Sequence, residues 1–333
     1  MTIAAGHIAP RAKSRRAIPL LPLLLGAVAL LVGFALPWLA PSKVAMSLMA
    51  QSLFDALLAT SVGFLVRQNG RVSFGQAAFF GLGGYVFAVL VARSLVAPEL
   101  ALVLALVVPT LVAFLFGLVV ARVTGVAHAM LTLAIGQALY EIAFRWRELA
   151  KGDDGMSFNL PGRLFGLSTR GLQDPAVMLV LAWSILVLVV LGLKLFSESR
   201  TGQIAAAIRD NEERARFVGF STTVPRALVY AIAAFVAAVA GILQASYNGY
   251  IAPQMFHWSL SGSALVMAIV GGAKFIIGPA IGAIVLFYVK DLASQFAEYW
   301  PAIVGTVLVV VTLVMPEGIV GLVSRITGLG QRR

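Results

Sequence analysis

The few ionisable side chains that interrupt the apolar runs of this sequence are the ones suited to binding a solute or to pairing helices. Asp55 lies about eleven residues inside the apolar run 44–66, four residues after Gln51. A carboxylate at that depth in a membrane costs about 2.5–3.5 kcal/mol on insertion scales and normally faces other helices. Two interpretations stay open: Asp55 lines a solute path near a substrate ammonium, or it hydrogen-bonds a neighbouring helix, and we favour the second.

Catalytic and metal-binding sets are not recognisable in the sequence. The three histidines, His7, His128 and His257, lie far apart, and no pair has metal-ligand spacing. The absence of cysteine excludes disulfides and thiolate metal sites. No Ser-His-Asp set, nucleophile elbow or G-x-x-x-x-G-K-[ST] phosphate loop occurs. We therefore expect a chain that is not an enzyme and that binds no metal, ATP or other cofactor itself.

Three further acidic residues have simpler interpretations. Glu141 precedes Arg145 by four residues, the favourable order for an ion pair along one helix face. Asp153 and Asp154 lie in a glycine-bounded turn, KGDDGM. We expect this turn to be an ordinary solvated loop. If it has a function, we prefer docking of another protein to cation binding.

The stretch 73–85, SFGQAAFFGLGGY, holds four glycines that lack the spacing of a phosphate loop. On a helix its small residues form one stripe that suits close packing against another helix. The stripe consists of Ala77, Gly81, Gly84 and Ala88, and Gly278 and Gly282 of GPAIGA are expected to pack in the same way. The residues beside the stripe are, with Asp55, candidates for lining a solute path, namely Gln76, Phe80 and Phe87. The opposite, lipid-facing side holds Phe79, Leu82, Val86 and Leu90.

Membrane helices must position these residues, as the composition of the chain indicates. Of 333 residues, 60% are hydrophobic and 12% are charged, too few polar residues to cover a soluble domain of this length. A helix needs about 20 apolar residues to cross a bilayer. The sequence predicts an all-α polytopic membrane protein with about ten transmembrane helices. We place them at 17–40, 44–66, 74–94, 99–121, 126–145, 175–196, 227–249, 259–273, 278–297 and 301–315.

The net charge of +11 is explained by orientation in the membrane rather than by nucleic acid binding. With both termini in the cytoplasm, cytoplasmic segments hold 17 of the 25 Lys and Arg residues, as the positive-inside rule requires. These residues are Arg11, Lys13, Arg15, Arg16, Arg67, Arg71, Arg122, Lys194, Arg200, Arg209, Arg214, Arg216, Arg226, Lys274, Arg325, Arg332 and Arg333. We expect cytoplasmic tails at 1–16 and 324–333, a transmembrane domain at 17–323, an outside loop at 146–174 and a cytoplasmic loop at 197–226.

Ten spans divide into two sets of five, and an odd number of spans inverts one half relative to the other. Glycine-interrupted segments near 73–85 and 271–283 fall at roughly corresponding places, which is typical of a transport path at a repeat interface. The correspondence is loose, so two inverted five-helix halves and a bundle without a repeat both stay open.

The cytoplasmic loop 197–226 contains a helix pattern that starts near Ser199 and stops at Gly219. It carries both charge signs beside an apolar edge of Ala205, Ala206, Ile208 and Phe217. Such a helix suits docking into a groove of another protein or lying on the bilayer surface, and spacing alone does not separate the two.

Several stretches of the sequence, in order, resemble the LivM branch of the branched-chain amino acid permeases. Glu213-Arg214-Ala215-x-x-x-Gly219 is similar to the E-A-A-x-x-x-G coupling motif of ABC importer permeases, with Arg214 in place of the first alanine. The other stretches are SFGQAAFFGLGGY, MLTLAIGQALYEIAFRWRELAKGDDGM, SRTGQIAAAIRDNEERARFVGF, GPAIGAIVL and MPEGIVGLV. The resemblance covers roughly residues 44–323. Two positions depart from the usual sequence of this family. Gln76 stands where many relatives have His, and Ala273-Lys274 follows Gly271-Gly272 where the family has a different pattern.

The resemblance implies a type II ABC importer-like permease in the bacterial inner membrane. It would pair with a LivH-type permease, two cytoplasmic ATPases that bind ATP and Mg, and a periplasmic binding protein. The implied coupling residues are Arg209, Asp210, Asn211, Glu212, Glu213, Ala215 and Gly219. The implied solute is a branched-chain or other hydrophobic amino acid, moved by alternating access. Urea, short amides and aromatic acids stay open as solutes, and an ion-coupled secondary transporter is the alternative from another class.

Overall fold

The computed structural model describes residues 20–40, 42–147, 151–159, 164, 168–296, 302, 305–306, 309, 311, 313–315 and 317–326. Within these residues the chain is almost entirely helical, with one short antiparallel pair of strands. The tail predicted at 1–16, about half of the span predicted at 301–315 and the tail beyond residue 326 lie outside the described residues.

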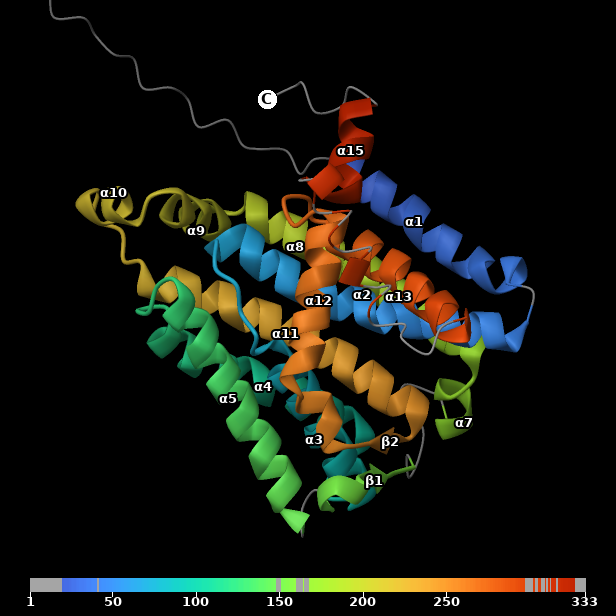
Figure 1. Cartoon of the computed structure of the whole chain (residues 1–333). Coiled ribbons are helices and arrows are strands. Elements are labelled where there is room, and N and C mark those ends of the chain that lie inside the picture. The colour runs from blue at the N-terminus through green and yellow to red at the C-terminus, as the bar shows by residue number, and fades with distance from the viewer. Residues whose placement is uncertain are drawn as a thin grey trace, which may run out of the picture.

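The elements follow one another as Figure 1 shows. The first part of the chain forms α1 (Leu20–Leu39), α2 (Lys43–Asn69), α3 (Gln76–Ala92), α4 (Pro98–Val120), α5 (Val126–Arg145), η1 (Gly152–Asp154), β1 (Met156–Ser157) and α7 (Thr169–Leu172). The second part forms α8 (Pro175–Glu198), α9 (Arg200–Asp210), α10 (Glu212–Phe217), α11 (Thr223–Asn248), β2 (Tyr250–Ile251), η2 (Pro253–Phe256), α12 (Trp258–Gly271), α13 (Gly278–Phe296) and α15 (Gly318–Ile326).

The predicted spans correspond closely to the helices. Each predicted span from 17–40 to 278–297 matches one helix within about four residues at either end. Five described helices, α2, α4, α5, α8 and α11, are long and apolar enough to cross a membrane. Because α3 and α12 are only 17 and 14 residues long, helix length establishes a multi-pass bundle but no exact number of crossings.

The bundle has two distinct ends. The end that we call the arm end carries α9, α10 and α15, and the opposite end, the sheet end, carries β1 and β2 (Figure 1). The two strands pair in antiparallel fashion, Met156 opposite Ile251. At the arm end Lys274 pairs with Glu317 at 3.3 Å, so the turn between α12 and α13 is tied to the beginning of α15.

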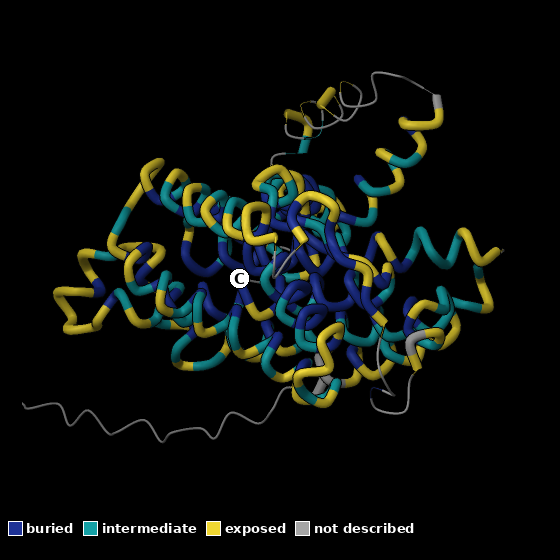
Figure 2. The backbone as a smooth tube through the Cα atoms, turned by 90° about the horizontal axis from the view of Figure 1, so that it is seen from below, coloured by how far each residue is buried: buried dark blue, intermediate teal, exposed yellow. Residues whose placement is uncertain are grey.

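The centre of the bundle is formed by α2 and α11, which are mostly buried, whereas α4, α5 and α8 are mostly not. In Figure 2 the buried backbone forms the middle of the molecule. α11 packs against α2, α3 and α4, while α2 also packs against α8, α12 and α13.

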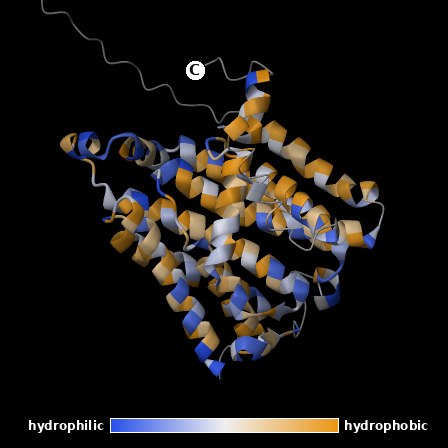
Figure 3. Cartoon of the chain, in the orientation of Figure 1, coloured by the Kyte–Doolittle hydropathy of each residue, from blue (hydrophilic) through white to orange (hydrophobic). Residues whose placement is uncertain are grey.

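The α4 helix shows which face of an outer helix turns inward. Its buried positions include the small residues Ala101, Ala105 and Ala113, and its exposed positions include the larger Val107 and Leu111. Small residues let helix backbones approach closely, and large apolar side chains exposed to the outside fit lipid rather than water. Figure 3 shows apolar residues along the outer helices and polar residues gathered toward the arm and sheet ends.

One very close helix contact lies between α3 and α11. A Cβ atom added to Gly241 would lie 1.9 Å from the carbonyl oxygen of Phe80, and one added to Gly83 would lie 2.8 Å from the backbone of Ala238. The two backbones therefore touch, and no larger side chain fits at Gly241 unless the helices separate.

We predict that Gly241→Ala separates these helices and lowers the stability of the folded chain by about 2 kcal/mol, the usual cost of overpacking. Gly192→Ala is the matched control, because Gly192 lies in helix α8 with nothing within 4 Å of the added Cβ atom. Thermal unfolding in detergent, followed by size-exclusion chromatography, measures both. Equal melting temperatures for the two variants would contradict this account of the contact.

Candidate functional site

The projecting arm at the arm end consists of two helices where the sequence predicts one. α9 begins after Ser199, whose hydroxyl accepts a hydrogen bond from the Gly202 amide at 3.2 Å. The helix breaks at Asn211, which adopts an extended conformation, and the Asn211 side chain accepts from the Arg214 amide at 2.8 Å. Asparagine followed by two glutamates is a strong helix start, because the side chain caps the first turn and acidic residues favour the positive helix end.

The second arm helix, α10, ends at Gly219 through a Schellman motif. The Phe220 amide donates to the Ala215 carbonyl at 3.1 Å, and the Gly219 amide donates to the Arg216 carbonyl at 2.9 Å. Gly219 has φ of 95°, in the left-handed region that favours glycine. The glycine of the coupling-like motif therefore sets where α10 stops and how the chain returns to α11.

A single carboxylate, that of Glu212, anchors α10 to the membrane helices. Its oxygens contact Arg226 at 2.5 Å, Arg216 at 2.7 Å and Arg71 at 3.4 Å, and accept a hydrogen bond from the Thr222 hydroxyl at 3.1 Å. We call these five residues the Glu212 cluster. Arg226 lies in the first turn of α11 with its side chain only 6% exposed, so the cluster ties the arm directly to the central helix.

The charge of Glu212 is stabilised by this arrangement. Burial acts to raise the pKa of Glu212, but the hydrogen bond and charge of Arg226, the Thr222 hydroxyl and Arg216 outweigh it, so the pKa lies below the ordinary value of 4.5. A carboxylate with a lowered pKa stabilises the folded state above its ordinary pKa and loses that contribution as the pH falls through the lowered value. Glu212 is therefore charged at neutral pH.

The same cluster reaches the turn between α4 and α5. Arg71 donates to the carbonyl oxygens of Ala121 at 2.9 Å and Val123 at 2.6 Å. The His128 ring contacts the Val120 carbonyl at 3.2 Å, and the Asn69 amide donates to the Arg226 carbonyl at 3.2 Å. The ends of α2, α4, α5 and α11 are thus joined in one polar layer beneath α10.

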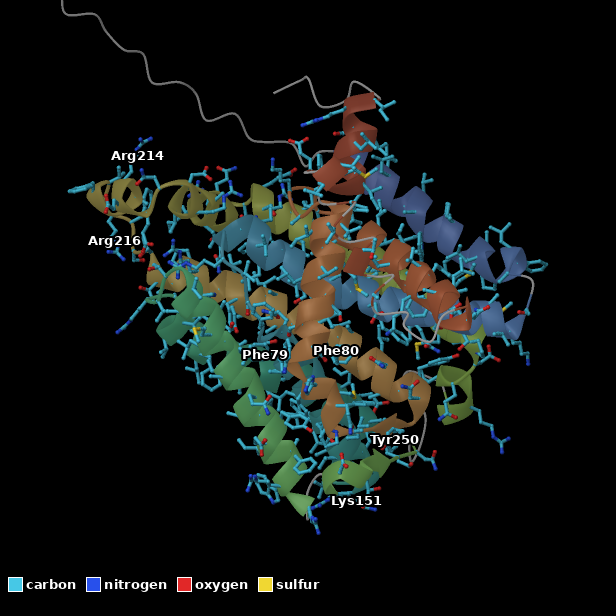
Figure 4. The ribbon with its side chains drawn as sticks, viewed as in Figure 1. Phe79, Phe80, Lys151, Arg214, Arg216 and Tyr250 are labelled. Atoms are coloured by element: carbon cyan, nitrogen blue, oxygen red, sulfur yellow. The ribbon has the colours of Figure 1, made fainter. Side chains whose placement is uncertain are left out.

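The two faces of the arm differ. Ala205, Ile208 and Ala215 are buried, whereas the Phe217 side chain is 91% exposed and Val218 is 70% exposed. The single apolar edge predicted for the arm is therefore wrong: the break at Asn211 turns Phe217 away from the inward face. Figure 4 shows Arg214 and Arg216 on the projecting arm, far from Lys151 and Tyr250 at the other end of the molecule.

The other residues predicted to couple this chain to partner ATPases divide between these two faces. Arg209 contacts Gly70 at the end of α2, donates to the Arg67 carbonyl and pairs with Asp210 at 2.7 Å. Asp210 and Glu213 are exposed.

Asp55 borders a cavity of about 520 Å³ that α2, α12 and α13 enclose with Gln244 of α11. The other three path candidates lie elsewhere. Gln76 is fully buried and accepts a hydrogen bond from the Ser61 hydroxyl at 3.0 Å, and Phe80 and Phe87 are buried in the core. In this conformation those three residues pack the interior instead of lining an opening.

The stripe of small residues on α3 lies at close contacts. A Cβ atom on Gly81 would meet the ring of Phe256 at 2.7 Å, one on Gly84 would meet the Gly241 carbonyl at 3.2 Å, and Ala77 and Ala88 are fully buried. The lipid-facing assignment of Phe79 is wrong, because Phe79 is fully buried and packs edge-on against Tyr230 of α11 at 5.6 Å.

The turn between α12 and α13 is also held by glycine contacts. A Cβ atom on Gly278 would lie 2.1 Å from the Gly272 carbonyl, and one on Gly282 would lie 2.1 Å from the Met267 carbonyl. The helices therefore meet backbone to backbone beside the Lys274–Glu317 pair.

At the sheet end the acidic turn is tied to the segment after α11. Tyr250 donates to the Asp154 carbonyl at 2.9 Å, and Gln254 donates to the Asp153 carboxylate at 3.1 Å. In the described part of the chain no group of acidic residues and histidines is arranged to hold a metal ion. The predicted pair of Glu141 and Arg145 is confirmed at 3.0 Å.

Sequence reasoning missed the partners of Glu212. In the sequence Arg71 and Arg226 contribute only to the positive charge expected on the cytoplasmic side. The available signal is the acidic pair Glu212-Glu213, which follows an asparagine in a loop whose neighbouring helix ends carry Arg71 and Arg226.

Comparison with known proteins places most of this chain among transport permeases. Residues 44–315 match the family described as "Branched-chain amino acid transport system / permease component". The chain is 26% identical over 311 residues to the high-affinity branched-chain amino acid transport system permease protein LivM of Salmonella typhimurium, covering 87% of this chain and 73% of that protein. It is 27% identical over 282 residues to the corresponding protein BraD of Pseudomonas aeruginosa, covering 80% and 91%.

A shorter match, 33% identical over 147 residues, relates the chain to the permease protein LivH of Escherichia coli and covers 43% of this chain and 47% of LivH. No solved structure shows a significant match.

We predict that Glu212→Gln loosens α10 and speeds trypsin cleavage after Arg214 and Arg216 about fivefold, equivalent to about 1 kcal/mol for a partly exposed ion-pair network. Glu213→Gln is the control, because Glu213 is exposed and is not part of the Glu212 cluster. Because the pKa of Glu212 is lowered, the wild-type cleavage pattern stays constant at any pH well above 4.5. Equal acceleration in both variants would show that the cluster does not anchor the arm.

Proposed function

The chain belongs to the branched-chain amino acid transport system permease family, and from that premise we propose its function. It is the membrane-spanning subunit of an ATP-driven ABC importer for branched-chain or other hydrophobic amino acids, and it works by alternating access with a second permease subunit. The observation that carries this proposal is the family match over residues 44–315, together with relatives that are themselves permease proteins of such systems.

The arm is proposed to couple this chain to the ATPases. Support comes from its construction: an exposed apolar tip at Phe217 with Arg214 and Arg216 beside it, on a short helix that the Glu212 cluster fastens to α11. A tip that docks into a groove and an anchor that transmits its motion are the two parts that coupling requires. The coupling residues implied by family resemblance, Arg209 through Glu213 with Ala215 and Gly219, all lie in this arm.

The helix packing supports two inverted halves in a type II importer-like bundle. α11 packs against α3 and α4, and α2 packs against α12 and α13, with α3 beside α4 and α12 beside α13. α3 leads away from the arm end, whereas α12 leads back toward it. This is the relation expected of inverted repeats, and it brings the short apolar helices α3 and α12 to corresponding places.

The partners and location follow from the same proposal. The sequence has no G-x-x-x-x-G-K-[ST] loop, so ATP and Mg would be bound by two partner ATPases at the arm end. A homologous permease would complete the path, and a periplasmic binding protein would deliver solute to the sheet end near the KGDDGM turn. The permease domain at 17–323 would lie in the bacterial inner membrane with both termini in the cytoplasm.

We predict that Phe217→Asp reduces recovery of the partner ATPases with the purified permease pair at least tenfold, because it places a charge in the docking contact. Leu95→Asp is the control, since Leu95 is also well exposed but lies in the turn after α3, away from the arm. Copurification from cells that express all subunits provides the measurement. Unchanged recovery with Phe217→Asp would favour an arm that lies on the bilayer surface.

Transport by the complete complex in proteoliposomes tests the function itself. We predict uptake of leucine that requires ATP and the binding protein and that is insensitive to ionophores. Uptake by the purified chain alone under an ion gradient would replace the proposal with a secondary transporter. Uptake of urea, amides or aromatic acids in preference to leucine would keep the ABC mechanism and change the solute.

A further inference from the structure

Helix α5 lies along one edge of the bundle (Figure 1) and differs in composition from the other outer helices. Like α4 and α8, it is mostly unburied within this chain, but it is much less apolar than either of them. The exposed positions of α4 hold large apolar side chains, as expected of a helix that faces lipid. These residues are Leu100, Val103, Val107, Leu111, Leu115 and Val119. Lipid is a poor neighbour for α5 by the same standard.

The inner side of α5 is fixed by contacts with α3 and α4. The His128 ring contacts the Val120 carbonyl at 3.2 Å, and the Thr132 hydroxyl accepts a hydrogen bond from the Phe74 amide at 3.1 Å. A Cβ atom added to Gly136 would lie 3.7 Å from the Phe74 carbonyl oxygen. Because residues 128, 132 and 136 recur at a spacing of four, they define one side of the helix and thereby also the opposite, outward side.

The outward side of α5 presents small and polar residues at the middle of the helix. Ala134 and Ala138 are exposed and lie four positions apart, with the half-buried Gln137 beside them. Within the described part of the chain the Gln137 side chain forms no hydrogen bond. A side-chain amide in the middle of a membrane helix normally bonds to another helix, and small residues at this spacing let a second backbone approach closely. Both features indicate a neighbouring protein helix.

The same side of the helix continues toward the two ends of the bundle. On the arm side Met130 is exposed, and on the sheet side Glu141 and Arg145 form their ion pair with side chains 43% and 82% exposed. We call the outward residues the α5 face: Met130, Ala134, Gln137, Ala138, Glu141 and Arg145. The α5 face therefore extends through the depth of the bundle, from the arm end to the sheet end.

The start of α5 is joined to the coupling arm. Arg71 of the Glu212 cluster donates to the carbonyl oxygens of Ala121 and Val123, in the turn that leads into α5. A displacement of the arm that preserved these bonds would also act on α5. A subunit bound at the α5 face would thus be in reach of the movement that alternating access requires.

We propose that the α5 face is the surface through which this chain binds the second permease subunit. A membrane helix of that subunit packs along Ala134 and Ala138 and hydrogen-bonds Gln137. Of the partners in the proposed function, only the second permease crosses the membrane, and the middle of α5 is out of reach of the ATPases and the binding protein. This inference rests on the proposed function and deepens it, because it assigns the surface at which the two permeases meet.

Site-specific photocrosslinking tests the α5 face in the complete complex. The photoreactive residue p-benzoylphenylalanine is placed at position 138, and at position 111 on the outward side of α4 as the matched control. Membranes that contain all subunits are irradiated, and the adducts of this chain are identified by mass spectrometry. We expect position 138 to crosslink the second permease and position 111 to give no such adduct.

Two substitutions test the contact by recovery of the second permease with this chain. Ala138→Trp should lower recovery about tenfold, because a close helix contact tolerates overpacking poorly. Gln137→Leu should lower it to a smaller extent, because it removes one hydrogen bond across the contact. Leu111→Trp is the control and should leave recovery unchanged. The melting temperature of each purified chain in detergent checks its folding, which Ala138→Trp should preserve because Ala138 is exposed within this chain.

The outcomes separate this surface from the proposed function. If the complex imports leucine with ATP but position 138 does not crosslink the second permease, or position 111 does so equally well, the surface is wrongly assigned and the importer stands. If position 138 crosslinks the second permease but no ATP-driven uptake occurs, the surface stands and the importer is wrong. Adducts of position 138 with lipid alone or with a second copy of this chain, or unchanged recovery with both Ala138→Trp and Gln137→Leu, would also overturn the assignment.

Discussion

The rest of this structure depends on the backbone contact between α3 and α11. In a lipid environment apolar side chains gain little by leaving the solvent, so helices associate through close packing, which small residues permit. Gly241 against the Phe80 carbonyl and Gly83 against Ala238 bring the two backbones together. With α11 held in place, α2 and α4 pack on its other faces, and the remaining helices are added around this centre.

The central helix α11 also links the arm to the Asp55 cavity. In its first turn Arg226 binds Glu212 of the arm at 2.5 Å, and near its far end Gln244 lines the Asp55 cavity. A displacement of α10 that preserved the Glu212 cluster would therefore act on the helix that borders the cavity. The arm and the cavity are thus connected through one helix, as the proposed mechanism of alternating access would require.

Buried glycine contacts fix the packing of the helices, whereas charged clusters hold the loops at the arm end. The contacts of Gly241 and Gly278 are made of backbone and allow no larger side chain, so they fix how helices meet. The Glu212 cluster and the Lys274–Glu317 pair lie at the arm end and hold loops through ionic contacts. Because ion pairs near water break at lower cost than packed backbones separate, we expect movement to occur at the arm end while the bundle core is preserved.

The sequence by itself determined that this is a helical membrane protein, where most of its helices begin and end, and to which family it is similar, because apolar length, helix caps and motif order are local properties of the chain. It also identified Asp55, Gly219 and the small-residue stripe as positions of interest. Only the tertiary structure decided that Phe79 is buried, that Phe217 points outward after the break at Asn211, that Arg71 and Arg226 meet Glu212, and that Lys290 lies across a cavity from Asp55. These pairings join residues up to hundreds of positions apart, and a hydrophobic pattern shows which faces are apolar but not which neighbour each face meets.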